Sequence, residues 1–352
     1  MKSQALVEHG APLREAAKTD PVPKGTEVLL RVAHCGVCHS DVHLQDGYFG
    51  LGGEKKLDTT GLHHLPFILG HEIEGEVAAL GEAATGVKPG ERRVAFPWIG
   101  CGDCAICTAG AEHLCNRPRA LGIHVDGGFS DRVMVPHPRY LLDHDGIPAD
   151  LAATYMCSGL TAFSALKKIG RAGAGEAIAI VGLGGVGMMG LRFARALFPE
   201  ATLIGADIDE RKRKAAADAG AELLYDSAEE DAAKRLIKET QGGVAAAIDF
   251  VGSEASLGFA NRVARKGGKV VIVGLFGGRF SMPIPMFPLR AISLIGSYVG
   301  SLAEAQEMLA LVRAGQVSPI PLESRPLDQA NRTLDDLRAG RVVGRVVLDC
   351  AA

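Results

Sequence analysis

The 352-residue sequence has no long apolar run, no excess of charge of one sign and no cysteine framework spread along its length. Its 38 Lys and Arg residues against 41 Asp and Glu residues give a net charge of −3. No nucleic-acid partner is expected, because such a partner requires a clustered basic face. No run of 18 or more apolar residues occurs, so a membrane span is not expected. The N-terminal segment lacks the apolar stretch of a secretory signal, which favours a cytoplasmic location.

The composition instead indicates a folded globular protein. Hydrophobic residues make up 47% of the chain and charged residues 22%, which is enough to bury a full core and to exclude general disorder. At about 150 residues per domain, the length predicts two domains. Glycine is over-represented, at 45 of 352 residues, against an average of about 7%. This excess indicates many tight turns and close backbone approaches.

The two halves of the chain differ in their expected secondary structure. Short apolar runs separated by Gly, Pro and Asp predict a β-rich first domain, with strands at residues 28–33, 73–80 and 93–96. From about residue 152, strand-like and helix-like segments alternate, which predicts a parallel, doubly wound α/β sheet. The later strands are expected at residues 177–181, 202–206, 246–251, 270–273 and 342–348, with helices ending near residue 197 and at 211–219 and 301–314.

A glycine-rich turn follows the first strand of this second half. Gly182, Gly184 and Gly187 form a G-x-G-x-x-G pattern that opens a helix, and Asp207 ends the next strand. In this setting the pattern predicts a dinucleotide site, in which the free N–H groups of the helix N-terminus bind the pyrophosphate. Asp207 would accept hydrogen bonds from ribose hydroxyls and repel a 2′-phosphate. NAD is therefore favoured over NADP, although the basic residues that follow soften the preference.

Half of the eight cysteines lie within one 15-residue window, as Cys101, Cys104, Cys107 and Cys115. Four thiolates at such short spacing can close a tetrahedral shell around one zinc ion. A closed shell has no open position, so the predicted role is structural. An iron–sulfur cluster and a set of free thiols are the alternatives.

Three separate motifs supply a second candidate metal site. They are Cys38 in Gly-Val-Cys-His-Ser-Asp, His71 in Gly-His-Glu and Cys157 in Met-Cys-Ser-Gly. Taken singly, each residue is more often a core thiol or an ordinary polar residue. Taken together, upstream of a dinucleotide motif, two cysteines and one histidine form a set that leaves a fourth zinc position open. Such an open set is typical of catalytic zinc.

With these motifs in this order, the chain resembles the zinc-dependent alcohol dehydrogenases of the medium-chain dehydrogenase/reductase superfamily. The resemblance covers essentially the whole length and includes the closing Gly-Arg-Val-Val-Gly-Arg-Val-Val-Leu. It implies an α/β fold with a GroES-like, β-rich catalytic domain and a Rossmann domain with a doubly wound parallel sheet. The implied limits are residues 1–157 and 298–352 for the zinc-binding catalytic domain and 158–297 for the NAD-binding domain.

The resemblance also assigns roles at the catalytic centre. It makes Cys38, His71 and Cys157 the catalytic zinc ligands. Asp41 resembles the carboxylate that orients the ligand histidine, and Glu72 the acidic residue beneath the zinc. Ser40 resembles the hydroxyl that contacts the substrate oxygen, and His43 the outer base of a proton relay.

The cofactor contacts follow in the same way. His39 and Arg345 resemble residues that face the pyrophosphate, Thr161 lies near the nicotinamide position, and Lys212 resembles the adenosine-ribose contact. The full set implied to bind the cofactor is His39, Thr161, Gly182, Gly184, Gly185, Val186, Gly187, Asp207, Lys212, Val251, Val273, Leu275 and Arg345.

The function implied is reversible, NAD-dependent oxidation of a primary or secondary alcohol to an aldehyde or ketone, with two zinc ions per chain. A polyol or sugar dehydrogenase of the same superfamily is the alternative, but those enzymes tend to have glutamate where this chain has Cys157. A non-catalytic nucleotide-binding protein on this fold is a second alternative, which intact zinc ligands disfavour. Phe96, Trp98 and Leu121 are candidates for an apolar substrate pocket, or equally for the core.

Several features lie outside these assignments. Cys35 is expected to be a core thiol and Cys350 to have no function. Residues 47–65 form an extended segment, and its His63 and His64 are expected to be ordinary loop residues rather than metal ligands. The resemblance implies a homodimer or homotetramer, with residues 284–296 as a possible interface, and a small-molecule substrate as the other partner.

Overall fold

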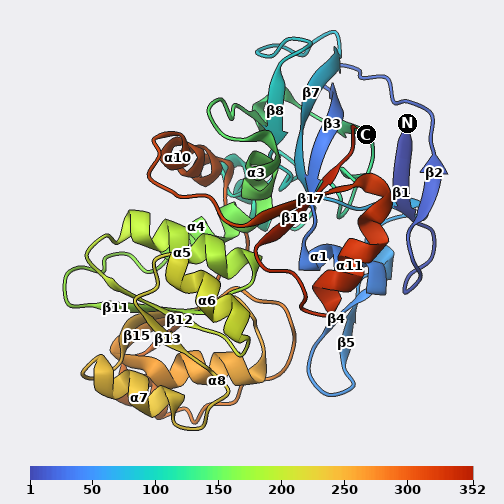
Figure 1. Cartoon of the computed structure of the whole chain (residues 1–352). Helices are drawn as coiled ribbons and strands as arrows, with labels where there is room; N and C mark the ends of the chain where they lie inside the picture. The colour runs from blue at the N-terminus through green and yellow to red at the C-terminus, as the bar shows by residue number, and fades with distance from the viewer. Residues whose placement is uncertain (352) are drawn as a thin grey trace.

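The computed structural model describes residues 1–351 and contains two lobes. One lobe is rich in β-strands and holds both ends of the chain, whereas the other alternates strands and helices from the middle of the sequence (Figure 1). Within residues 1–351, no helix has the length and apolar character needed to cross a membrane.

The β-rich lobe is built around a seven-stranded sheet in the order β10-β8-β7-β3-β18-β17, with β9 also paired to β3. The last strand, β18, lies antiparallel to β3 and pairs Leu348 with Cys35, so the end of the chain completes the sheet of the first domain. The strands of this lobe are β1 (Lys2–Leu6), β2 (Arg14–Ala17), β3 (Val28–Gly36), β4 (Tyr48–Gly50), β5 (Lys56–Asp58), β6 (Phe67–Ile68), β7 (Glu72–Leu80), β8 (Arg92–Ala95), β9 (Arg132–Val135), β10 (Leu141–Leu142), β17 (Leu322–Pro326) and β18 (Arg345–Asp349). Its helices are α1 (His39–Asp46), α2 (Ala105–Thr108), α3 (Ala149–Thr154), α10 (Leu302–Arg313) and α11 (Ala330–Arg338), with short turns η1 (Thr60–Leu62), η2 (Glu112–Leu114), η3 (Pro138–Tyr140) and η5 (Leu327–Gln329).

The second lobe contains a six-stranded, fully parallel sheet in the order β13-β12-β11-β14-β15-β16. If these six strands are numbered along the chain, their order in the sheet is 3-2-1-4-5-6, which is the strand order of a Rossmann fold. Its strands are β11 (Ala177–Val181), β12 (Thr202–Ala206), β13 (Leu223–Tyr225), β14 (Val244–Asp249), β15 (Ala264–Ile272) and β16 (Ser293–Gly296). Its helices are α4 (Leu160–Lys167), α5 (Gly185–Leu197), α6 (Glu210–Asp218), α7 (Ala232–Glu239), α8 (Glu254–Val263) and α9 (Met286–Arg290).

Burial explains why the central strands were predictable. Every residue of β11 is buried, because helices cover both faces of a parallel sheet, and a continuous apolar run is the result. Several limits differ from the expectation by one to six residues, among them the starts of two strands. β15 begins at Ala264, several residues before the predicted start, because a polar stretch precedes its apolar part. β18 begins only at Arg345, since Gly344 has a φ of +82° and a side chain there would lie 2.1 Å from the Pro321 carbonyl oxygen.

Candidate active site and metal centres

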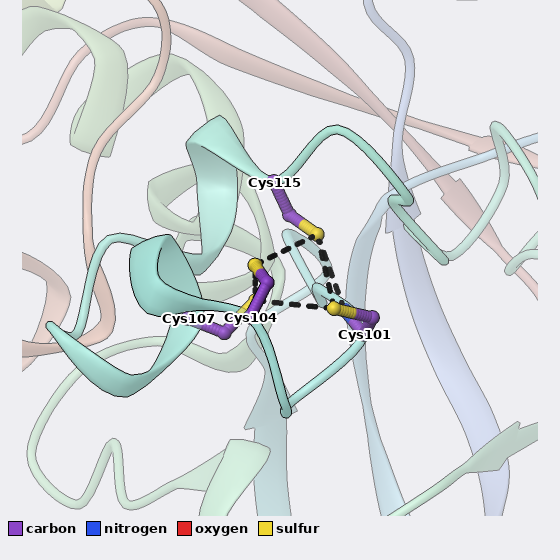
Figure 2. A group of neighbouring side chains, drawn as sticks. All are labelled: Cys101, Cys104, Cys107 and Cys115. Carbon is purple, nitrogen blue, oxygen red and sulfur yellow. Dashed lines mark hydrogen bonds between the residues drawn. The ribbon is translucent and has the colours of Figure 1, made fainter.

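The four clustered cysteines converge at one point of the β-rich lobe (Figure 2). The Sγ atoms of neighbouring pairs lie 3.5 to 3.9 Å apart. A zinc ion with four sulfurs at about 2.3 Å requires sulfur–sulfur distances of about 3.8 Å, so the geometry fits one tetrahedral ion. An iron–sulfur cluster would hold some of the cysteine sulfurs farther apart, because its four cysteines bind two or four separate irons.

Cys38, His71 and Cys157 also come together, although 119 residues separate the two cysteines. Their Sγ atoms lie 4.0 Å apart, close to the spacing expected for two ligands of one zinc ion. All three residues are buried, and within residues 1–351 the Nε2 atom of His71 has no hydrogen-bond partner. Hydrogen bonding with Cys157 lowers the pKa of Cys38 well below its ordinary value, which favours the metal-binding thiolate. The group therefore fits a zinc ion with three protein ligands.

Local backbone structure brings each ligand to this point. Cys38 is the N-cap of α1, and His71 follows Gly70, whose φ of +93° turns the chain into β7. Cys157 lies in η4 (Tyr155–Gly159), a π-helical turn between α3 and α4. Single π-helical turns within α-helices are rare and occur frequently at functional sites. The turn was not predicted, because π-helical and α-helical sequences look alike.

Acidic residues surround the three ligands. Asp41 is fully buried, and its Oδ1 lies 3.2 Å from Nδ1 of His71, which suits the orienting role that the resemblance implies. Glu72 is also fully buried, accepts a 2.7 Å hydrogen bond from the Ser158 hydroxyl, and forms an ion pair with Arg345. Burial raises the pKa of Glu72. The sequence did not reveal Ser158 as a partner of Glu72.

The two relay candidates lie on α1. Ser40 Oγ lies 3.8 Å from Cys38 Sγ, beside the metal position. His43 is half-buried one turn farther along, and its ring lies 4.7 Å from that of Phe49. Burial lowers the pKa of His43. His39, at the start of the helix, is exposed.

The glycine motif forms the turn between β11 and α5. Gly182 has a φ of +86°, and a side chain on Gly187 would lie 1.8 Å from the Gly182 carbonyl oxygen. No atom lies within 4 Å of the position that a Gly184 side chain would take, so the backbone is open there to an approaching phosphate. Gly184 caps α5 without a side-chain hydrogen bond, which leaves helix N–H groups free.

Asp207 follows β12 directly and is largely buried. Its Oδ2 accepts a 2.7 Å hydrogen bond from the Leu183 backbone, so it also supports the glycine turn. Lys212 is partly buried on α6. Val251, Val273 and Leu275 follow the carboxyl ends of β14 and β15, where open α/β sheets bind ligands.

Arg345 links the two candidate sites. Its side chain is buried against Gly185 at the start of α5, while its guanidinium group pairs with Glu72 beside the metal ligands. Its Nε atom has no hydrogen-bond partner within residues 1–351. Thr161 is buried on α4, which continues from the turn that carries Cys157.

A cavity of about 330 Å³ lies between Trp98, whose ring contacts the ligand His71, and the four-cysteine group, whose Cys115 lines it. The Trp98 ring meets the His71 ring edge-on at 5.5 Å, and its Nε1 donates a 2.8 Å hydrogen bond to the Met156 carbonyl oxygen. Tyr298 packs on Trp98 at 5.8 Å, and both rings line the cavity. Phe96 and Leu121 are fully buried and do not line it. Of the three apolar pocket candidates, only Trp98 therefore faces this space.

The remaining candidates are structural. Cys35 and Cys350 are both buried, and Cys350 Sγ donates to the Gly128 carbonyl oxygen at 3.4 Å. His63 stacks on Phe67 at 4.0 Å and His64 is exposed, so neither joins a metal-ligand group of the described chain.

Comparisons with known proteins agree with this geometry. The family profile "Alcohol dehydrogenase GroES-like domain" matches residues 24–145, and "Zinc-binding dehydrogenase" matches residues 185–314. NAD-dependent alcohol dehydrogenases of Sulfurisphaera tokodaii and Saccharolobus solfataricus are 37% and 36% identical, over 99% of this chain and of each relative.

A solved structure of the alcohol dehydrogenase from Aeropyrum pernix superposes with a TM-score of 0.90 at 31% identity, over 99% of this chain and 100% of that one. D-arabinose dehydrogenase from Sulfolobus solfataricus superposes with a TM-score of 0.84 at 25% identity, over 99% and 98%. The expected fold class, a GroES-like domain with a Rossmann domain, is confirmed. The chain belongs to the zinc-binding alcohol dehydrogenases of the medium-chain dehydrogenase/reductase superfamily.

Proposed function

We propose that this protein oxidises primary or secondary alcohols to aldehydes or ketones with NAD+, and that it runs the reverse reaction with NADH. One observation carries the proposal. Three buried residues can hold a metal ion and leave its fourth position open. Arg345 connects them to the glycine turn that would bind the dinucleotide, because its guanidinium group pairs with Glu72, next to the ligand His71, while its side chain packs against Gly185. Hydride transfer requires this proximity of metal and cofactor.

The residues of the chain divide the work. Cys38, His71 and Cys157 would hold zinc, with Asp41 fixing the orientation of His71. When bound, zinc polarises the alcohol oxygen and NAD+ accepts the hydride. We propose that Ser40 relays the hydroxyl proton, accepting it while its own proton leaves towards His43. His43 then releases a proton to solvent, because an imidazole exchanges protons near neutral pH.

The cavity beside Trp98 and Tyr298 is the proposed position of the substrate's carbon chain. Its aromatic walls exclude water from the reacting carbon. A sugar or polyol dehydrogenase is less well supported, because Cys157 occupies the third ligand position. The superposition on D-arabinose dehydrogenase shows a shared fold and does not alter this argument from Cys157.

Metal analysis combined with NADH formation on a panel of alcohols tests the proposal. We expect about two zinc ions per chain, NAD-dependent oxidation, and loss of activity with a chelator. The variant Cys157→Ser should retain about one zinc ion and lose turnover. A zinc-loaded protein that oxidises no alcohol would contradict the proposal and favour a nucleotide-binding role.

We also propose a homo-oligomer and a cytoplasmic location. Ile284 and Leu289 are 81% and 67% exposed, in the segment that precedes the edge strand β16 of the parallel sheet. Clustered apolar side chains of this kind are typical of subunit interfaces. All eight cysteines are free thiols, and six of them belong to the two metal-ligand groups, which suits a reducing compartment.

A further inference from the structure

The cavity beside Trp98 is lined by both apolar and polar side chains. Trp98 and Tyr298 form the side next to His71. The lining also includes two histidines, His113 and His124, and Cys115 of the four-cysteine group. His124 lies on a tight turn, where its backbone N–H donates a 2.9 Å hydrogen bond to the Ala120 carbonyl oxygen.

That turn is held rigidly against the metal site. A side chain on Gly122 would lie 2.3 Å from the carbonyl oxygen of Gly70, the residue before the ligand His71. The backbone of the turn therefore packs directly on the backbone that positions the ligand. This packing holds the turn that carries His124 in place relative to the ligand His71, as a specificity contact requires.

Hydrogen bonding within the described chain leaves this histidine unused. The Nδ1 atoms of His113 and His124 are buried and have no partner within residues 1–351. An unpaired buried N–H is rarer and costlier than an unpaired lone pair, so the single proton of a neutral ring is favoured on Nε2. Burial lowers the pKa of His124, which keeps the ring neutral. The ring can then offer an Nε2–H donor to a ligand.

The charge of the wall limits which group can be recognised. The ten lining residues include Glu112 but no Lys or Arg. Glu112 is already paired with Arg139 and with the Tyr140 hydroxyl. An anionic substrate group would meet a carboxylate and no free cation, whereas an uncharged oxygen would meet an N–H donor.

We infer that His124 selects alcohols that carry a second, uncharged oxygen atom away from the reacting carbon, such as a terminal diol. This inference rests on the proposed function, since it assumes that the substrate chain enters this cavity. A site built to hydrogen-bond a substrate oxygen discriminates against the analogue that lacks it, because the donor is then left unpaired.

Trp98, the single tryptophan of the chain, allows occupancy of the cavity to be measured without turnover. Fluorescence titration of the zinc-loaded protein without NAD+ would compare alkanols of four to eight carbons with the matching terminal diols and ω-hydroxy acids. At least one diol should bind about tenfold more tightly than its alkanol, and the hydroxy acids should show no gain. The ratio of kcat/KM values should follow the same order.

Variants of His124 identify the atom involved. His124→Gln keeps a polar group near the Nε2 position and should retain most of the preference, whereas His124→Phe and His124→Asn should abolish it. His64→Phe, at an exposed histidine outside the cavity lining, is the matched control and should leave it unchanged. Thermal melting would identify any variant that has not folded.

Equal affinity of the wild-type protein for diols and alkanols would overturn the inference about His124. If NADH is still formed on alcohols in that case, the proposed function stands. Tighter binding of the hydroxy acids than of the diols also overturns it. A diol preference in fluorescence with no NADH formed on any alcohol supports the specificity contact and contradicts the proposed function.

Discussion

Asp207 has two tasks, because both of its carboxylate oxygens are occupied. One accepts the Leu183 N–H and the other the Asp209 N–H, at 2.7 and 2.9 Å. The charge still lies at the end of β12, where an adenosine ribose would bind. Replacing it should therefore change cofactor choice and slightly loosen the glycine turn.

We expect Asp207→Ser to lower the ratio of kcat/KM for NAD+ over NADP+ by about tenfold or more, because a like charge no longer repels the 2′-phosphate. The matched control is Asp209→Ser, since Asp209 caps α6 and serine is an equally good cap. Steady-state kinetics with both cofactors give the two ratios. A ratio that Asp207→Ser leaves unchanged would remove Asp207 from the ribose site.

Glu74 stabilises the β-rich lobe through a buried network. Its carboxylate lies 2.9 Å from His34 Nδ1 and 3.2 Å from His144 Nε2, and accepts two hydrogen bonds from Arg92. Burial alone would raise the pKa of Glu74, but the hydrogen bonds outweigh it and lower the pKa to about 2, from 4.5. The ionised form is therefore the one that the fold stabilises.

Glu74→Gln should lower the free energy of unfolding by about 2–3 kcal/mol near neutral pH. A lowered folded-state pKa contributes stability that is fully present above pH 4.5 and lost as pH falls towards about 2, so the deficit of the variant should shrink across that range. Urea unfolding at several pH values measures it. Glu76→Gln is the control, because Glu76 lies on the same strand as Glu74 but forms a surface ion pair with Arg31; it should cost less than about 0.5 kcal/mol.

At the residue scale, sequence motifs predicted which residues lie close together when each motif belongs to a single site. The four-cysteine group and the glycine turn come from local spacing, whereas Cys38, His71 and Cys157 come from three separate motifs and the family resemblance. The structure places the members of each metal-ligand group close together. Contacts between distant segments were not predictable in this way. Ser158 with Glu72, and His124 beside the cavity, depend on how loops pack, and no spacing in the chain encodes them.

At the scale of elements, the π-helical turn Tyr155–Gly159 aims Cys157 at the other ligands. Gly159 allows it, because a side chain there would lie 2.5 Å from Cδ1 of Tyr155 and 3.3 Å from Sδ of Met308. Buried strands such as β11 and β12 match their predicted limits, since continuous apolar runs mark them. The π-helical turn has no comparable sequence pattern, so it became visible only in the structure, between α3 and α4.

Gly159→Ala should displace this turn, so that zinc content falls from about two ions to about one per chain and turnover drops at least tenfold. The four-cysteine site should keep its ion, because its four ligands all lie within residues 101–115 and none belongs to this turn. Gly258→Ala is the control: it lies within α8 and its added methyl group meets only the end of Arg262, so helix propensity predicts up to about 1 kcal/mol of stabilisation. Full zinc occupancy in Gly159→Ala would show that the turn tolerates the added group.

At the scale of the whole molecule, the two lobes are joined by more than the chain itself. The hairpin of β4 and β5 reaches the other lobe, where a side chain on Gly277 would lie 2.6 Å from the Gly50 carbonyl oxygen. Arg345 makes a second link between the lobes. The domain limits at residues 157 and 297 stay a prediction. Contacts between the lobes show that the lobes touch, but they do not show at which residue one domain ends and the other begins.

The exposed apolar side chains of the Rossmann lobe lead to the last prediction. If residues 284–296 form a subunit interface, the wild-type protein has the mass of two or more chains, and Ile284→Lys combined with Leu289→Lys should yield monomers, because each lysine would bury an unpaired charge. Light scattering after size-exclusion chromatography measures the mass. Val22→Lys, at a residue 74% exposed in the β-rich lobe, should leave it unchanged. An oligomer that survives the double substitution would place the interface on another surface.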